Sequence, residues 1–428
     1  MTPAFTAQVA QNQYLPRGAD RAHAVVSIAC QGGAITVRRP LAEALLVDCS
    51  GSMDGEKIRH ARAAVSVAID QLRDDAWFCV IAGTDSANAV VPMTRVTPVA
   101  KAAAKSVVAK LQASGGTAMS TWLNAALKEF ARAPGTIPHA LLLTDGLNQN
   151  ETDDSLIATV ARCEGVFPCD ARGVGTDWKP DQLRLITSKL LGSVDIIPKA
   201  ADIPTDFRRV IDAAMGKAVA DVSLRVWAPV GATIEFCRQV YPEAVDLTAR
   251  AVTRPSTPQV RDYPTGAWGE EKRDYHVCIR VTPGQVGQRM LAGRVSLVVS
   301  EGGTETKLSE GMILAVWTDD DAQSAVIHPE VAHYTGQAEL ANAIQEGLKA
   351  RAAGDDARAT SLLGRAVQIA AESHPETMKL LKKVVEVEDE QRGTVKLLKK
   401  VAKEDEFALD TRSVKTARVS KPPKGDTP

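Results

Sequence analysis

The stretch EALLVDCSGSMDGEKIRHARAAVSVAID (residues 43–70) joins a short apolar run to a longer run with a different rhythm. Residues 43–48 are mostly apolar, which is typical of a strand buried on both faces of a parallel sheet. In residues 56–73 apolar side chains recur every three or four positions, as on one face of a helix. These positions are Ile58, Ala61, Val65, Ala68, Ile69 and Leu72. The stretch therefore predicts the first strand–helix unit of an α/β domain.

The alternation of strands and helices continues to residue 217. Further strands are expected at AWFCVIAG (76–83), NAVVPM (88–93), HALLLTD (139–145), FPCDARGVG (167–175) and SVDIIP (193–198). Helices are expected at 98–112, 119–132, 153–163, 180–191 and 203–217. Such alternation gives a parallel sheet with helices on both faces. We predict a doubly wound, mostly parallel α/β domain over residues 43–217.

The segments on either side of this domain show strand patterning. After residue 218, strands are expected at 221–229, 232–240, 274–281, 294–302 and 312–318, separated by turns that carry Pro or Gly. In residues 1–42, HAVVSIAC (23–30) and AITVRR (34–39) flank Gly32-Gly33 and predict a β-hairpin. A lone hairpin is marginally stable in water. We therefore expect it to join a β-sandwich at 218–320, with the α/β domain inserted between the two segments.

Helical patterning returns in residues 328–402. A helical hairpin is predicted from 330–351 and 355–372, which are rich in Ala and Leu. A third helix is expected from about Pro375 to Glu388. The hairpin resembles a tetratricopeptide pair, although one pair is weak evidence for a repeat.

The last segment, residues 403–428, ends in a polar and basic stretch that contains proline, and we expect it to be disordered. Thr411, Ser413 and Thr416 lie among basic residues there, where a kinase could reach them. Phosphate at these positions would create a ligand for a reader domain lined with arginine. A plain solvated tail is the alternative interpretation.

Composition restricts the class of protein. The 428 residues suggest two or three domains, and the net charge of −1 gives no overall attraction to nucleic acid or to a membrane. The N-terminus lacks the features of a signal peptide, and no apolar run is long enough to span a membrane. Seven scattered cysteines without a CxxC spacing indicate a reduced, cytoplasmic setting.

Oxygen-bearing side chains stand in three loops that are far apart in the sequence. Asp48, Ser50 and Ser52 follow the first buried strand, Thr117 lies in Ser-Gly-Gly-Thr before a helix, and Asp145 ends a strand and precedes Gly146. In a doubly wound sheet these loops lie at the edge formed by the carboxyl ends of the strands, where such folds bind ligands. Taken singly, the first loop could be a helix N-cap and the second an ordinary turn. Their order and spacing together favour a metal site.

This combination of DxSxS, a Gly-Gly-Thr loop and an Asp in TDG resembles the metal-ion-dependent adhesion site of von Willebrand factor A domains. The resemblance covers about residues 41–215, and DCSGSM followed by GEKI is similar to the bacterial, intracellular branch of the family. It implies a site in which the two serines and the threonine contact the metal, while the two aspartates contact it directly or through water. The implied ligands are Asp48, Ser50, Ser52, Thr117 and Asp145.

The residue types suit a hard dication. Mg²⁺ prefers six oxygen ligands and retains water, and Mn²⁺ or Ca²⁺ could take its place. Three neutral hydroxyls and two carboxylates leave at least one exchangeable water, which a carboxylate of a partner can replace. We therefore expect a non-catalytic, metal-dependent binding module that binds an acidic protein partner. The resemblance implies bacterial neighbours such as a kinase, a phosphatase, a phosphopeptide reader or an AAA-type ATPase, as in tellurium-resistance-like stress systems.

Two other functions stay open. A bound cation with a vacant position could activate water in a metal-dependent hydrolase, but no His or Glu stands near the motif as an evident base. A structural scaffold with a vestigial metal site is the third possibility, and the complete ligand set argues mildly against it. Near Gly173-Val174-Gly175, Asp177 and Trp178 either border the metal site or form a plain loop.

Overall fold

The computed structural model describes residues 4–31, 39–301, 304–416 and 418. The chain divides into two compact units. The α/β unit comprises the described residues of Val37–Ala220 and Lys400–Thr411. The β-rich unit comprises those of Met1–Thr36, Asp221–Lys399 and Arg412–Pro428. Among the described helices, none combines the length and the apolar character that a membrane crossing requires.

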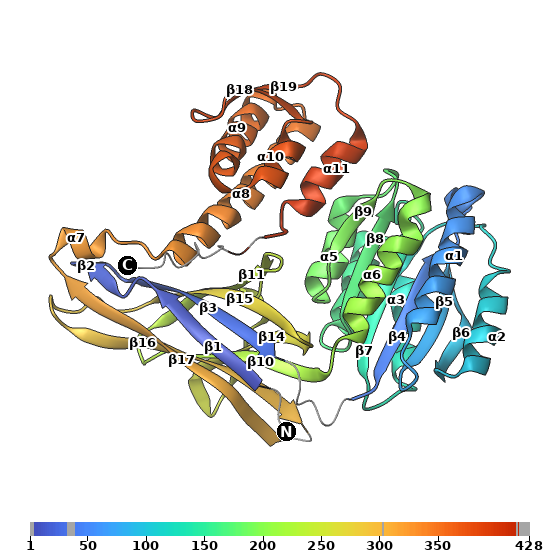
Figure 1. Cartoon of the computed structure of the whole chain (residues 1–428), viewed down its shortest axis with the longest axis horizontal. Helices are drawn as coiled ribbons and strands as arrows, with labels where there is room; N and C mark the ends of the chain where they lie inside the picture. The colour runs from blue at the N-terminus through green and yellow to red at the C-terminus, as the bar shows by residue number, and fades with distance from the viewer. Residues whose placement is uncertain (1–3, 32–38, 302–303, 417, 419–428) are drawn as a thin grey trace, which may run out of the picture. The chain divides into compact units, whose positions relative to one another are not determined.

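The α/β unit is built on a six-stranded sheet in the order β6-β5-β4-β7-β8-β9 (Figure 1). Its strands are β4 (Leu41–Asp48), β5 (Trp77–Gly83), β6 (Ala87–Arg95), β7 (Ile137–Thr144), β8 (Cys169–Val174) and β9 (Val194–Ile197). Neighbouring strands run parallel except for β6, which pairs antiparallel with β5. The prediction of a mostly parallel α/β sheet is confirmed.

Helices follow the strands in the predicted alternation. They are α1 (Glu56–Gln71), α2 (Pro98–Val108), α3 (Met119–Phe130), α4 (Asp153–Cys163), α5 (Pro180–Lys189) and α6 (Ile203–Met215). Helix α1 packs against α6 and α2, and α3 packs against α4. Strand order reverses at β4, because the chain goes first to β5 and later to β7. In sheets with such a reversal, crossovers in opposite directions place helices on both faces, and ligands bind at the carboxyl ends of the strands where the order reverses.

Two tryptophan rings pack directly against glycines near the ends of strands β5 and β8. A methyl group on Gly83 would lie 2.3 Å from the Trp122 ring, and one on Gly173 would lie 1.9 Å from the Trp178 ring. Both tryptophans are buried. Because any side chain would displace these rings, the ends of β5 and β8 require glycine.

The β-rich unit contains two large sheets, in the orders β1-β3-β15-β11-β12 and β13-β14-β10-β16-β17-β2. The N-terminal strands are β1 (Ala4–Gln11), β2 (Tyr14–Pro16) and β3 (Arg21–Gln31). The later strands are β10 (Val219–Trp227), β11 (Thr233–Tyr241), β12 (Val245–Asp246), β13 (Val252–Arg254), β14 (Thr257–Trp268), β15 (Glu271–Arg280), β16 (Arg289–Glu301) and β17 (Thr304–Thr318). Strand β3 pairs antiparallel with β15, and β2 pairs parallel with β17. The N-terminal segment thus shares both sheets with strands that follow the α/β segment.

The predicted N-terminal hairpin is only partly right. Its first strand lies within β3, but β3 pairs with β1, which the sequence analysis did not assign. The predicted second strand, 34–39, lies outside the described residues except for Arg39, which is not in a strand. Strand β1 was missed because it contains polar residues such as Thr6 and Gln8. Their side chains are exposed, while their backbone pairs with β3.

The region predicted as helical, 328–402, is mixed. A short helix, α7 (Asp321–Ser324), precedes it, and α8 (Pro329–Ala352) and α9 (Asp356–Ser373) then pack together. The third helix is wrong beyond residue 381, since α10 spans only Pro375–Leu381. Residues beyond it form an antiparallel hairpin of β18 (Val385–Asp389) and β19 (Thr394–Leu397). Alternating valines (Val385, Val387, Val395) and a turn at Gly393 with φ of 65° favour strands there.

The prediction of a disordered tail at 403–428 is wrong for its first part. Residues Lys403–Arg412 form helix α11, which belongs to the α/β unit through residue 411. The Phe407 ring packs edge-on against Trp178 at 5.1 Å between centroids, and Asp410 accepts a hydrogen bond from Arg184 at 2.7 Å. We predicted disorder because the segment is polar overall, and its contact with the core through Phe407 could not be seen in its composition. Residues 419–428 lie outside the described part of the chain.

The proposed phosphorylation positions are also not on a solvated tail. Thr411 is fully buried and Ser413 is 7% exposed. The Thr416 hydroxyl donates a hydrogen bond to the Val240 carbonyl at 2.5 Å. A kinase could not reach Thr411 or Ser413 without displacing the segment that carries them.

Candidate functional site

Asp48 ends β4 and is fully buried at the edge of the sheet. Both of its carboxylate oxygens accept hydrogen bonds, Oδ1 from the Ser50 N–H at 2.8 Å and Oδ2 from the Thr144 hydroxyl at 2.6 Å. Burial raises the pKa of Asp48, the hydrogen bonds from Ser50 and Thr144 lower it, and the charge of Asp145 raises it. The carboxylate is therefore held in one orientation by its neighbours.

The first loop is attached to the second by main-chain hydrogen bonds. The Gly51 N–H donates to the Gly115 carbonyl at 2.9 Å, and the Ser114 N–H donates to the Cys49 carbonyl at 2.7 Å. The short 3₁₀ helix η1 (Gly51–Met53) begins between these contacts, with Ser50 as its N-cap residue. These hydrogen bonds hold the two loops side by side at the edge of the sheet.

A line of oxygen atoms connects the first loop to β7. The Ser50 and Ser52 hydroxyl oxygens lie 3.0 Å apart, and the Ser52 hydroxyl donates to Asp145 Oδ1 at 2.7 Å. Asp145 follows β7 directly and is fully buried. Strands β4 and β7 are paired neighbours, with Val47 opposite Leu143, so both aspartates stand at the same edge of the sheet. Residues 97 positions apart in the chain are brought together in this way.

Thr117, in the second loop, brings its hydroxyl close to that of Ser52. A methyl group on Gly146 would stand 3.2 Å from the Ser52 hydroxyl oxygen and 3.5 Å from that of Thr117. Both hydroxyls therefore border one small space above Gly146, and a larger residue there would fill it. Asn150 fixes this loop, since it accepts from the Thr117 N–H at 3.1 Å and donates to the Thr117 carbonyl at 3.0 Å.

We call Asp48, Ser50, Ser52, Thr117 and Asp145 the carboxyl-edge cluster. Among the described residues, no three His, Cys, Asp or Glu side chains are placed to hold a metal ion together. Any cation at this cluster would therefore depend on hydroxyl oxygens as well as on carboxylates. Hard cations such as Mg²⁺ accept such oxygen ligands.

Lys57 is a member of the surroundings that sequence reasoning missed. Its ammonium group donates to Asp145 Oδ2 and lies 4.0 Å from Asp177 Oδ2. Gly55, with φ of 78°, turns the chain so that the first residues of α1 face the sheet edge. The sequence signal was present in GEKI directly after the motif, but the direction of the lysine depends on this turn.

The other nearby candidates have plain roles. Trp178 is buried and its indole N–H donates to the Gly175 carbonyl at 2.9 Å, so it is a core residue. Asp177 is 74% exposed. Burial raises the pKa of the Cys49 thiol to about 12, which keeps it protonated and unreactive.

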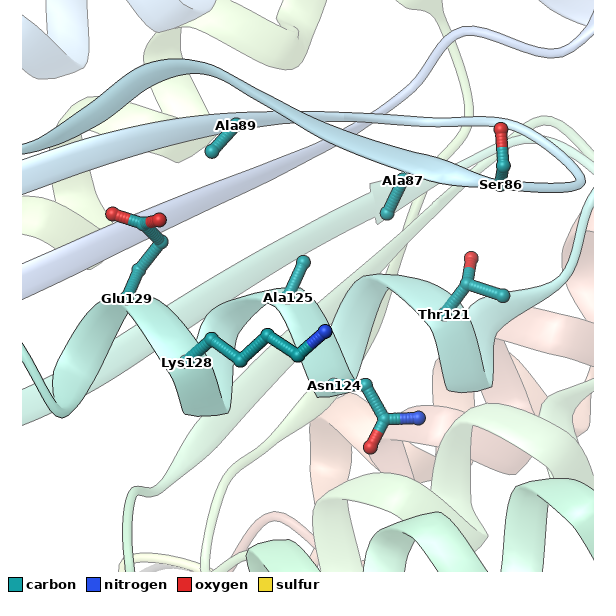
Figure 2. A pocket seen from close by; sticks show the side chains of 8 residues that line it. All are labelled: Ser86, Ala87, Ala89, Thr121, Asn124, Ala125, Lys128 and Glu129. Carbon is teal, nitrogen blue, oxygen red and sulfur yellow. The ribbon is translucent and has the colours of Figure 1, made fainter.

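A shallow pocket of about 410 Å³ lies between β6 and α3 in the same unit. Figure 2 shows its mostly small lining residues, with Ser86 and Thr121 at one end and Glu129 at the other. Among the described side chains that line it, the one carboxylate, Glu129, already accepts from the Met93 N–H at 2.6 Å. We therefore assign the functional chemistry to the carboxyl-edge cluster and not to this pocket.

Comparisons with known proteins agree with this placement. Residues 44–196 match the family model of the von Willebrand factor type A domain, and residues 368–413 match that of the von Willebrand factor type A C-terminal domain. The second match spans the β18–β19 hairpin and helix α11, where the sequence analysis was wrong.

Solved structures and a curated relative add to the family matches. The chain is 47% identical to a von Willebrand factor type A protein from Catenulispora acidiphila, with a TM-score of 0.93 and 97% of each chain covered. The VWA2 paralog of ArnB from Sulfolobus acidocaldarius shares the fold at 13% identity, with a TM-score of 0.58 and 96% and 98% coverage. An uncharacterised Synechocystis protein, sll0103, is 30% identical over 219 residues, and the match spans 51% of its length.

Proposed function

Because the chain belongs to the von Willebrand factor type A family, we propose that it is a non-catalytic binding module that holds a divalent cation. The cation is Mg²⁺, or Mn²⁺ or Ca²⁺ in its place, at the carboxyl-edge cluster. Its free coordination position binds a carboxylate of a protein partner. The observation that carries this proposal is the meeting of hydroxyl and carboxylate oxygens from three loops at one buried corner of the sheet.

The oxygens, which hydrogen-bond to one another, already lie as close together as the ligands of a small octahedral ion. Neighbouring ligands around Mg²⁺, each about 2.1 Å from the ion, lie about 3.0 Å from one another. The oxygen atoms of Ser50 and Ser52 are 3.0 Å apart, and those of Ser52 and Asp145 are 2.7 Å apart. Ser50, Ser52 and Thr117 would hold the ion through their hydroxyls, with Asp48 and Asp145 supplying the negative charge.

The same donor set favours binding over hydrolysis. A hydrolase would need a base beside the metal-bound water, whereas Asp145 contacts Ser52 and Lys57, and Asp48 contacts Ser50 and Thr144. A metal-dependent hydrolase is the alternative function, and nothing in the arrangement of these contacts favours it.

The biological setting belongs to the same proposal. We propose a bacterial, cytoplasmic signalling or assembly complex, with a kinase, a phosphatase, a phosphopeptide reader or an ATPase as neighbour. Neither nucleic acid nor a membrane surface is a proposed partner, since the net charge of −1 gives no general attraction to either. The family resemblance supports this setting.

Calorimetry tests the metal site directly. Mg²⁺ or Mn²⁺ titrated into chelator-treated protein should bind with one-to-one stoichiometry, and binding should disappear in Asp145→Ala and Ser52→Ala. Asp54→Ala is the matched control, because Asp54 is exposed in the same loop and has no place in the cluster. Absence of binding by the unaltered protein would contradict the proposal.

Affinity capture then tests the partner. Partners recovered from the native host in Mg²⁺ should be lost both in EDTA and with Asp145→Ala, but retained with Asp54→Ala. Equal recovery in all four samples would contradict metal-dependent binding.

A further inference from the structure

We infer that Lys57 is a built-in positive charge of the metal site, which opposes loading of the cation and makes the loaded site attractive to an acidic partner. This inference rests on the proposed function. It gives that site a means of regulation, since the sign of its charge depends on whether the metal is bound.

The geometry divides the Asp145 carboxylate between two tasks. Oδ1 faces the hydroxyl of Ser52, on the side of the proposed ion, and Oδ2 accepts from the ammonium group of Lys57. Asp145 is fully buried, whereas the Lys57 side chain is 29% exposed. The ammonium therefore covers the solvent side of a buried carboxylate.

Other charges nearby are engaged elsewhere or are further away. Asp177 Oδ2 lies 4.0 Å from the ammonium and is 74% exposed, so solvent screens it. On the outer surface of α1, Glu56 pairs with Arg59 and lies 3.3 Å from His60. Lys57 is thus the cation that contacts an acidic member of the carboxyl-edge cluster in the described structure.

Counting charges shows the consequence. Asp48 and Asp145 contribute −2 and Lys57 contributes +1, so the metal-free corner carries −1 and repels an acidic partner. A bound dication changes this sum to +1. The corner then attracts a carboxylate, and because it is partly desolvated the attraction is stronger than in bulk water. Without Lys57 the loaded corner would be neutral.

The ammonium also acts on the metal itself. A lysine that shares a carboxylate with the ion lies within several ångströms of it, and two positive charges at that separation repel each other. Lys57 therefore weakens metal binding.

Substitutions can separate the charge from the hydrogen bond. Lys57→Gln retains a donor for Asp145 without the charge, Lys57→Met removes both, and Lys57→Arg retains both. Lys105→Met is the matched control, because Lys105 forms an exposed ion pair with Asp70 at 2.6 Å in the same unit. Circular dichroism checks that each variant is folded, and Lys57→Gln remains informative if Lys57→Met is not.

Mn²⁺ titration calorimetry on the full chain tests the inference. Lys57→Gln and Lys57→Met should bind Mn²⁺ about tenfold more tightly than the unaltered protein, while Lys57→Arg and Lys105→Met should not differ from it. Equal or weaker binding by Lys57→Gln would overturn the inference and leave the proposed function standing. Failure of the unaltered protein to bind Mn²⁺ would instead defeat the proposed function itself.

Discussion

The α/β unit has a group of charged side chains toward each end of its central strands. The two groups differ in the partners that their carboxylates contact. At the carboxyl ends, Lys57 contacts Asp145, and among the described residues it is the cation that contacts either aspartate. Toward the amino ends, His139 of β7 lies between two carboxylates, with Nδ1 2.9 Å from Glu43 and Nε2 3.1 Å from Asp170. Five residues of strand, about 16 Å, separate the two groups along β4.

We call Glu43, His139 and Asp170 the bridged cluster. Burial alone would lower the pKa of His139, but Glu43 and Asp170 outweigh it and raise the pKa to about 10. Arg172 extends the network, donating from Nε to Asp206 at 2.7 Å. In the bridged cluster both carboxylates contact the imidazole, whereas in the carboxyl-edge cluster Asp145 contacts Lys57 and Asp48 is held by the neutral donors Ser50 and Thr144. The difference suggests that the first cluster serves stability and the second serves binding.

Breaking the bridged cluster should produce the largest effect on stability. His139→Leu leaves the buried Glu43 carboxylate and the partly buried Asp170 carboxylate without their partner, and we expect it to lower the free energy of unfolding by about 3–5 kcal/mol. Urea denaturation followed by circular dichroism measures this. His60→Leu is the control, because His60 lies on α1, is 19% exposed and has no place in the bridged cluster, and it should change the free energy of unfolding by less than about 1 kcal/mol. Equal effects of the two changes would show that the bridged cluster is not a stabilising network.

The same cluster should make stability depend on alkaline pH. The pKa of His139 is raised above the value of about 6.5 expected in the unfolded chain, so the stabilisation is complete below that pH. It should decline as the pH rises toward about 10, by about 4 kcal/mol. Comparing unfolding curves of the protein and of His139→Asn between pH 6 and pH 10 isolates this term. Parallel curves would contradict it.

Neutralising the carboxyl-edge cluster should act only through the metal. Asp48→Asn removes one of two neighbouring carboxylates, so the metal-free protein should keep its melting temperature to within a few degrees. The stabilisation by saturating Mg²⁺, about 2.7 kcal/mol at one hundred times the dissociation constant, should be lost. Differential scanning calorimetry with Mg²⁺ and with EDTA compares the two forms. A large loss of stability in EDTA would make this cluster structural, like the bridged one.

Filling the space above Gly146 should have a smaller effect. The added methyl of Gly146→Ala would lie 3.2 Å from the Ser52 hydroxyl oxygen, and we expect about tenfold weaker Mn²⁺ binding, or about 1.4 kcal/mol. Gly336→Ala is the control, because a methyl there meets no atom within 4 Å. Unchanged affinity in Gly146→Ala would mean that the ion lies elsewhere.

The two clusters also show what a sequence can predict. Four of the five predicted ligands stand at the ends of β4 and β7, so strand order brings them to one edge. Thr117 lies in the loop between α2 and α3, and its Gly-Gly-Thr motif was the signal for it. Lys57 was not predictable in this way, because the direction of its side chain depends on the positive φ of Gly55. The bridged cluster was missed because its members, such as His139 and Asp170, lie within strands that read as apolar runs.

Outside the α/β unit, errors followed from local composition. Strand β14 contains Pro258 and Pro264, residues that argue against a strand. Helix α11 is acidic in its first turn, and it contacts Trp178 through Phe407, its one aromatic residue. Tertiary contacts decide the structure of such segments, and these contacts cannot be predicted from the local sequence pattern.

An anomalous difference map from a Mn²⁺-soaked crystal would test the central claim most directly. We predict one peak at the carboxyl edge of the sheet, about 2.2 Å from the hydroxyl oxygens of Ser50, Ser52 and Thr117, and no peak at the bridged cluster. A peak confined to another part of the molecule, or none at full Mn²⁺ saturation, would contradict the account.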